Sequence, residues 1–182
     1  MLFRSGRGAV DALLRAGVSL LGKRVLVLGS GGAARAIAMT VALHGQPAEM
    51  EILGVVEPEL GRLGEDISRY APAPVRTHLL DDAALSVAIE RAEILLQCTP
   101  VGMLPETERT LVPSKFLRSD LVVFDAVYNP RRTRLLREAA SNGCRVVEGM
   151  EMFLGQAMVQ FELWTGKPAP MEAMRRVIEA RL

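Results

Sequence analysis

The chain has 182 residues, a formal net charge of +1 at pH 7, 49% hydrophobic residues and 24% charged residues. This length suits one domain, since domains usually run to about 100–200 residues. The composition is that of ordinary globular proteins and argues against a nucleic-acid footprint or a disordered tail. The longest apolar runs are too short to span a bilayer, and the N-terminus lacks the apolar stretch of a signal peptide. We therefore expect no nucleic-acid or membrane partner and a cytoplasmic location.

Short β-rich apolar runs alternate along the chain with amphipathic stretches of helical length. The alternation predicts an α/β fold with a doubly wound, mainly parallel sheet of about six strands, covered by helices on both faces. The predicted strands are residues 24–28, 50–56, 75–79, 94–97, 121–125 and 145–147. The predicted helices between them are residues 32–44, 59–70, 81–90, 130–142 and 150–164. Two further helices, residues 8–16 and 171–182, lie outside the sheet pattern and are expected to carry apolar faces toward another domain.

The first predicted strand opens into the loop Gly29-Ser30-Gly31-Gly32-Ala33-Ala34 and then into a helix. Gly29 allows a sharp turn, Gly31 leaves room for a pyrophosphate beside the backbone, and Ala34 permits close packing of helix on strand. The free N–H groups at the positive end of the helix dipole would receive the pyrophosphate. We therefore predict that a dinucleotide is bound by Gly29, Ser30, Gly31, Gly32 and Ala33. A purely structural tight turn is the alternative.

The choice between NAD and NADP is usually made after the second strand, where an acid holds the ribose hydroxyls of NAD or an arginine accepts the extra phosphate of NADP. Glu57 stands at this place and mildly favours NAD. An acid that only caps the following helix is the alternative interpretation. Arg35 and Arg62 could still supply a counter-charge for a phosphate, so both NADP and NAD remain candidate cofactors.

The other candidate residues follow later strands, at the carboxyl edge where open α/β sheets bind ligands. The fourth strand ends in the segment Thr99-Pro100-Val101-Gly102-Met103, and the fifth is followed by Val127 and Tyr128. On the helix that comes next, spacing predicts that Met152 and Phe153 are core residues. Tyr128 and Gln156 are evenly balanced between function and ordinary packing or capping. Cys98 and Cys144 have no metal-ligand spacing and are expected to be buried free thiols, so no metal site is predicted.

From Leu21 to the C-terminus the sequence resembles the NADP-binding, Rossmann-type domain of shikimate dehydrogenases and the related quinate dehydrogenases. The resemblance rests on ordered motifs: Gly29 to Ala36, Thr99 to Met103, Asp125 to Pro130 with Thr133, Leu135 and Leu136, Gly149 with Met152 and Gln156, and Trp164-Thr165-Gly166.

The resemblance implies hydride transfer between a nicotinamide cofactor and the 3-dehydroshikimate/shikimate pair. It implies that Gly149 lies beside the nicotinamide and that Tyr128 and Gln156 face the substrate. In such enzymes a lysine and an aspartate from a preceding domain act on the substrate hydroxyl. Here residues 3–8 look like the tail of that region, with Ser5 about where the aspartate would be, so no catalytic residue is assigned.

Three positions depart from the family pattern. Glu57 falls where an Asn-Arg-Thr segment usually grips the NADP phosphate, Gln97 replaces a common asparagine, and Glu151 replaces a glycine and is expected to narrow the nicotinamide pocket. We expect residues 1–182 to form a single NAD(P)-binding domain, with residues 1–20 and 167–182 leading toward a substrate domain. The chain is expected to be either a fragment of a longer protein that carries the substrate domain or one chain of a split enzyme, and alone to bind cofactor but turn over little. Docking to another chain or self-association would cover its apolar surface. Two alternatives are a non-catalytic NAD(P)-sensing module and the cofactor subunit of a dehydrogenase for another small polyol or acid.

Overall fold

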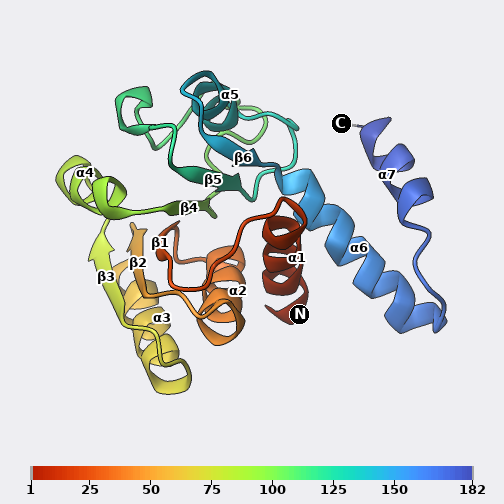
Figure 1. The fold of residues 1–182 in the computed structure, drawn as a ribbon, viewed down its shortest axis with the longest axis horizontal. Coiled ribbons are helices and arrows are strands. Elements are labelled where there is room, and N and C mark those ends of the chain that lie inside the picture. The colour runs from red at the N-terminus through yellow and green to blue at the C-terminus, as the bar shows by residue number, and fades with distance from the viewer. Residues whose placement is uncertain (1, 182) are drawn as a thin grey trace.

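The computed structural model describes residues 2–181, which contain one six-stranded, fully parallel sheet. The strands are adjacent in the order β3-β2-β1-β4-β5-β6, so the order in which successive strands are added reverses between β1 and β4 (Figure 1). This order is that of the doubly wound α/β fold and confirms the predicted class. The strands are β1 (Arg24–Leu28), β2 (Glu49–Gly54), β3 (Val75–Leu79), β4 (Ile94–Gln97), β5 (Val122–Asp125) and β6 (Arg145–Val147).

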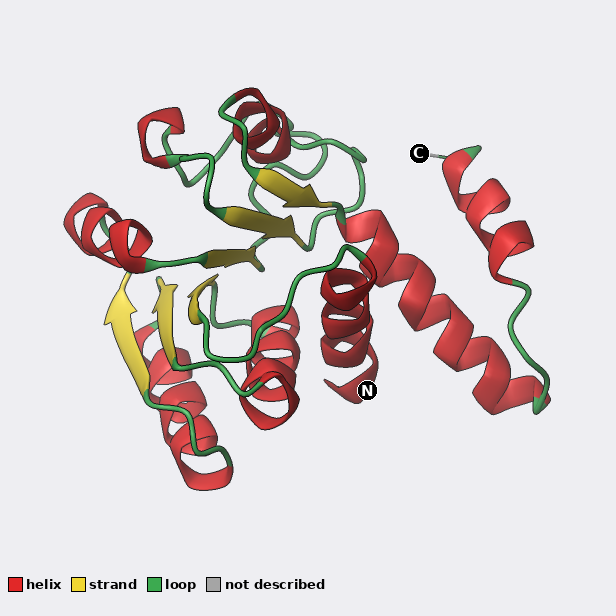
Figure 2. Ribbon diagram, in the orientation of Figure 1, coloured by secondary structure: helices red, strands yellow, loops and turns green. Residues whose placement is uncertain are grey.

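Helices cover both faces of the sheet (Figure 2). Helices α1, α2 and α3 pack on one face and α4 and α5 on the other, while α6 and α7 extend away beyond β6 (Figure 1). The helices are α1 (Leu2–Arg15), α2 (Gly32–Thr40), α3 (Glu57–Tyr70), α4 (Asp82–Arg91), α5 (Arg134–Ser141), α6 (Gly149–Thr165) and α7 (Met171–Glu179). Two short turns complete the set, a π-helical turn η1 (Val41–Gly45) that prolongs α2 and a 3-10 turn η2 (Ser114–Phe116).

The central strands are apolar on both sides because both of their faces are covered. In β1, Val25 and Val27 belong to the cluster under α1, α2 and α3, whereas Leu26 and Leu28 belong to the cluster under α4 and α5. All four side chains are at most 2% exposed. The sheet therefore holds the β1–α2 loop rigidly at its carboxyl edge.

Helix α1 is part of the core, which differs from the expectation that its apolar face would serve another domain. Ala9, Ala12 and Leu13 are at most 1% exposed. Glycines bring the neighbouring helices close: a Cβ on Gly6 would overlap the Thr40 hydroxyl and the Ala36 carbonyl on α2. A Cβ on Gly8 would lie 2.8 Å from the carbonyl oxygen of Met152 on α6. The apolar face of α1 is thus buried between α2 and α6.

Several predicted boundaries were wrong. Helix α1 begins at Leu2 rather than at residue 8, and α3 begins at Glu57 rather than at residue 59. Strand β2 ends at Gly54, and the two valines predicted to continue it are exposed, Val55 by 74% and Val56 by 42%. Helix α5 begins at Arg134 rather than at residue 130, because the hydroxyl of Thr133 caps it by accepting a hydrogen bond from the Leu136 N–H. The residues before α3 and before α5 therefore form loops at the carboxyl edge.

Within residues 2–181, no helix combines the length and apolarity needed to cross a membrane.

Candidate functional site

A cavity of about 520 Å³ opens at the carboxyl edge of the sheet, beside the point where the strand order reverses. Doubly wound sheets bind their ligands at this point. Three loops form its walls, one each after β1, β4 and β5. The lining residues are Gly31, Gly32, Ala33, Cys98, Thr99, Pro100, Met103, Leu104, Ala126, Val127, Tyr128 and Asn129.

The glycine loop has two kinds of glycine. Gly29 has a φ of +113°, and a Cβ there would lie 3.1 Å from the Thr99 side chain and 3.2 Å from the Cys98 carbonyl oxygen, so the fold itself requires glycine. Gly31 has an extended backbone (φ −69°, ψ −173°), and a Cβ at Gly31 or Gly32 would meet nothing within 4 Å. Neither packing nor backbone strain explains these two glycines. Open space at the lining of the cavity fits a ligand that approaches the backbone closely.

Backbone N–H groups are available at this point. Helix α2 begins at Gly32, its N-cap Gly31 has no side chain to occupy the first amides, and Gly32 and Ala33 are exposed. The first N–H groups of a helix lack partners within the helix, and the helix dipole favours negative charge there. This entrance has the donor geometry that a diphosphate needs, so the residues present fit a dinucleotide cofactor.

The loop after β4 is folded around a buried glutamine. Gln97 is 2% exposed, and its side-chain amide donates to the carbonyl oxygens of Thr99 and Val101 at 3.1 and 3.2 Å. Its side-chain oxygen accepts a hydrogen bond from the Thr99 N–H at 2.9 Å. Thr99, Pro100 and Met103 consequently face the cavity, whereas Val101 and Gly102 do not line it. Sequence reasoning noted Gln97 only as a departure from the family pattern and missed its part in shaping the loop.

The loop after β5 is held by a buried carboxylate. Asp125 is fully buried and accepts hydrogen bonds from the Val127 N–H at 3.0 Å and from the Thr133 hydroxyl at 2.6 Å. Burial raises the pKa of Asp125 to about 6, and these two hydrogen bonds oppose that rise. Burial also raises the pKa of the nearby Cys98 thiol, with a smaller contribution from Asp125, so this thiol stays protonated at neutral pH. Asp125 thus positions the loop whose Val127 and Tyr128 line the cavity.

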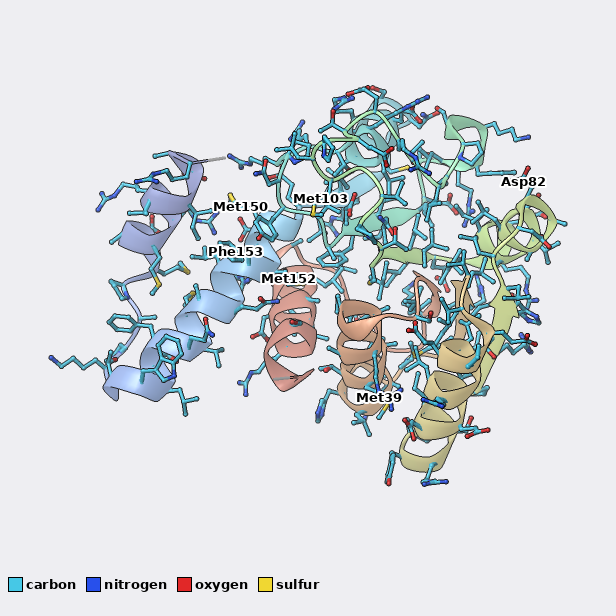
Figure 3. All side chains as sticks on the ribbon, turned by 180° about the vertical axis from the view of Figure 1, so that it is seen from behind. Met39, Asp82, Met103, Met150, Met152 and Phe153 are labelled. Carbon is cyan, nitrogen blue, oxygen red and sulfur yellow. The ribbon has the colours of Figure 1, made fainter. Side chains whose placement is uncertain are left out.

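Tyr128 stacks on Phe153 of α6, with ring centroids 4.5 Å apart and an angle of 10° between the planes. Met152 is buried in the core as expected, whereas Phe153, which was also predicted to be a core residue, is half-buried. Both residues lie near the start of α6 (Figure 3). Met152 and Phe153 are adjacent on one helix but have different roles. Met152 packs in the core, whereas Phe153 supports Tyr128, which lines the cavity.

Some predicted residues do not line the cavity. Glu57 is the exposed first residue of α3. Ser30 is a buried residue of the glycine loop, and its hydroxyl donates to the carboxylate of Glu59 at 3.0 Å. Gly149 is a packing glycine, since a Cβ there would lie 2.5 Å from the Val127 carbonyl oxygen. Gln156 is half-buried, with its Cγ 3.2 Å from where a Cβ of Gly8 would be.

Glu151 does not narrow the cavity, which corrects the expectation for this position. Its carboxylate forms two hydrogen bonds with the Arg175 guanidinium of α7, at 2.5 and 2.9 Å. The hydrogen bond with Arg175 lowers the pKa of Glu151 despite partial burial. The Glu151 carboxylate of α6 therefore forms an ion pair that holds α7 against α6.

The strand order, the glycine loop and the cavity beside the point where the strand order reverses together define a nucleotide-binding domain of the Rossmann class. The profile of the family described as "Shikimate 5'-dehydrogenase C-terminal domain" matches residues 149–179. The shikimate dehydrogenase (NADP(+)) of Methanosarcina mazei is 39% identical over 173 residues, which are 95% of this chain and 61% of that protein. The chain is thus similar, along nearly its whole length, to the part of shikimate dehydrogenases that includes their C-terminal domain.

Solved structures agree with this assignment. Shikimate 5-dehydrogenase from Listeria monocytogenes, solved with shikimate and NAD, superposes with a TM-score of 0.90 at 32% identity, covering 97% of this chain and 62% of that one. The 5-ketofructose reductase of Gluconobacter sp. strain CHM43 superposes with a TM-score of 0.83 at 28% identity, covering 98% of this chain and 63% of that one. The chain therefore spans about three fifths of the length of these relatives.

Proposed function

We propose that this chain binds a nicotinamide dinucleotide, NAD or NADP, and presents it for hydride transfer to a small substrate of the shikimate or quinate type. One observation carries the proposal. Gly31 and Gly32 have no structural need to be glycine, and both line the cavity at the bare start of α2. The relatives support it, since the Methanosarcina enzyme is named for NADP(+) and the Listeria structure contains NAD.

The residues divide into two groups in this proposal. Backbone amides of the glycine loop would hold the diphosphate, and the loops after β4 and β5 would border the nicotinamide. When bound, the cofactor supplies the hydride, while the protein binds and orients it. Tyr128 would contact the substrate from the rim of the cavity, where it is 39% exposed. Gln156 and Gly149 stay proposed site residues. The groups that move the substrate proton would come from a substrate-binding lobe, on this or another chain, and residues 2–181 would form the nucleotide-binding domain.

A substrate of another kind is the second candidate. The Gluconobacter neighbour is a 5-ketofructose reductase, so a similar fold, with a TM-score of 0.83, is found in an enzyme named for a keto sugar. Most substrate contacts would lie outside the cavity described here, and the fold alone does not select among small polyols and acids.

The test is titration of the purified chain with NADH and with NADPH, followed by nicotinamide fluorescence. We expect saturable binding of at least one nucleotide, and a loss of about tenfold or more in affinity for Gly31→Val, because the added side chain would fill the diphosphate position. Gly61→Ala is the matched control, since a Cβ at Gly61 also meets nothing within 4 Å but lies on α3. Binding of neither nucleotide, or unchanged affinity of Gly31→Val, would contradict the proposal. An assay of shikimate, quinate and 5-ketofructose turnover, with and without a substrate-binding lobe, then separates the two candidates.

A further inference from the structure

The second residue of the glycine loop makes a contact that the sequence pattern did not indicate. Ser30 is 9% exposed, and its hydroxyl donates to Oε2 of Glu59 at 3.0 Å. The same hydroxyl is packed against the end of β2, since a Cβ on Gly54 would lie 3.1 Å from it. Glu59, rather than Glu57, is therefore the acid that contacts the phosphate loop.

This contact lies where Rossmann domains distinguish NAD from NADP. In such domains an acid near the end of the second strand accepts hydrogen bonds from the ribose hydroxyls, whereas an arginine there holds the 2′-phosphate. The two residues that follow β2 are the exposed valines Val55 and Val56, which offer no charge and no hydrogen-bond donor from their side chains. The first charged residues after them are both acids, Glu57 and Glu59.

Three of the donors close to this place are already occupied or missing. The Arg35 guanidinium forms an ion pair with Asp66 on α3. The start of α3 offers few free amides, because Pro58 has no N–H and the Glu59 N–H donates to the Val56 carbonyl at 3.1 Å. The Ser30 hydroxyl donates its hydrogen bond to the Glu59 carboxylate. A 2′-phosphate would therefore meet the Glu59 carboxylate, a like-charge contact that is unfavourable. The exposed Arg62 of α3 is the side chain that could compensate for it, and the test below includes this residue.

We propose that Glu59, held by the Ser30 hydroxyl, sets the cofactor preference of this chain and favours NAD(H) over NADP(H). The inference rests on the proposed function, because it concerns the same dinucleotide site. Glu59 accepts hydrogen bonds from a ribose that bears two hydroxyls, and its charge opposes a ribose that bears a phosphate. Ser30 acts as the positioning residue that keeps this carboxylate against the loop.

The experiment compares the dissociation constants of NADH and NADPH for the full chain and for single variants, with the melting temperature measured in parallel. We expect wild type to bind NADH at least about tenfold more tightly than NADPH, which is the size of effect that one carboxylate near a dianion produces. Glu59→Gln keeps the shape and removes the charge, so it should reduce the NADPH/NADH ratio of dissociation constants about fivefold or more, with little change in melting temperature. Glu65→Gln, an exposed acid on the same helix, is the matched control and should leave the ratio unchanged.

Ser30→Ala separates positioning from charge. It should reduce the ratio partway toward that of Glu59→Gln, because Glu59 keeps its charge and loses the donor that holds it. Adding a cation through Val56→Arg in the Glu59→Gln background should improve NADPH binding further.

The outcomes that overturn the inference differ from those that overturn the proposed function. Equal binding of NADH and NADPH by wild type refutes the inference alone, as does a larger effect of Glu57→Gln than of Glu59→Gln. A loss of NADPH binding in Arg62→Ala refutes it as well, since this exposed arginine of α3 would then be the phosphate ligand. Binding of neither nucleotide refutes the proposed function itself.

Discussion

Tyr128 and Phe153 stack with their ring centroids 4.5 Å apart, and this contact joins the loop after β5 to helix α6. The pair lies at the rim of the cavity, with Tyr128 as one of its lining residues. Because Phe153 is on a helix and Tyr128 is on a loop, the helix restricts where the phenol can lie.

We predict that the two rings are energetically coupled by about 0.5–1.5 kcal/mol, the range for stacked aromatic pairs. The measurement is a double-mutant cycle of Tyr128→Ala and Phe153→Ala, with the free energy of unfolding determined in urea. Additive effects of the two substitutions would show that the stack contributes nothing to stability. Phe153→Tyr should keep most of the coupling, since it retains the ring.

The second prediction concerns the pH dependence that Asp125 introduces. Burial raises its pKa from 3.8 to about 6 in the folded protein. Between these two values the folded state binds a proton that the unfolded state has lost, so this group makes the protein less stable as pH rises from about 4 to about 6. The loss is on the order of 2–3 kcal/mol, at about 1.4 kcal/mol per pKa unit.

Asp125→Asn should remove this loss of stability between pH 4 and pH 6, because an amide does not titrate. The fold should be kept, because the amide oxygen can still accept from the Val127 N–H and the NH₂ group can donate to the Thr133 hydroxyl oxygen. Unfolding free energies at pH 4 and pH 6 check this, compared with Asp82→Asn, an exposed residue labelled in Figure 3. If Asp125→Asn and wild type change equally between the two pH values, Asp125 does not titrate in this range.

The third prediction concerns the attachment of α7. None of its residues is buried, and the Glu151–Arg175 ion pair joins it to α6. The pKa of Glu151 is lowered, so its contribution is present above the unfolded pKa of about 4.5 and is lost as pH falls through the lower folded value.

A partly exposed ion pair contributes about 0.5–1 kcal/mol. Glu151→Gln should therefore speed amide hydrogen exchange in residues 171–179 by about two- to fivefold, with little change in the strands. Glu172→Gln, an exposed acid on α7 itself, serves as the control. Unchanged exchange in Glu151→Gln would mean that the apolar contacts of α7 hold it without the ion pair.

The fourth prediction contrasts two glycines in helices. Gly6→Ala should destabilise the protein by several kcal/mol, on the order of an overpacked core, because its Cβ would overlap atoms of Thr40 and Ala36. Gly61→Ala, where a Cβ meets nothing within 4 Å, should instead stabilise it by about 0.5–1 kcal/mol. Thermal unfolding of both variants tests the pair. A tolerated Gly6→Ala would mean that α1 shifts easily on α2.

Local patterns sufficed for the strands, their parallel arrangement and the turn of the glycine loop. Strand and helix periodicity depends on neighbours in the chain, and the turn at Gly29 depends on backbone freedom that glycine alone has, with its φ of +113°. The loops after β4 and β5 were also found in the right place, because the carboxyl ends of parallel strands meet at one edge.

Contacts between distant segments decided the rest. Which of two acids meets the phosphate loop, Glu57 or Glu59, depends on how α3 begins after β2 and on the reach of Ser30. The burial of α1 depends on close crossings at Gly6 and Gly8, and the pairing of Phe153 with Tyr128 depends on where α6 lies against the loop after β5. Periodicity assigns a side chain to a face of its own helix, but only the packed fold determines what lies opposite that face.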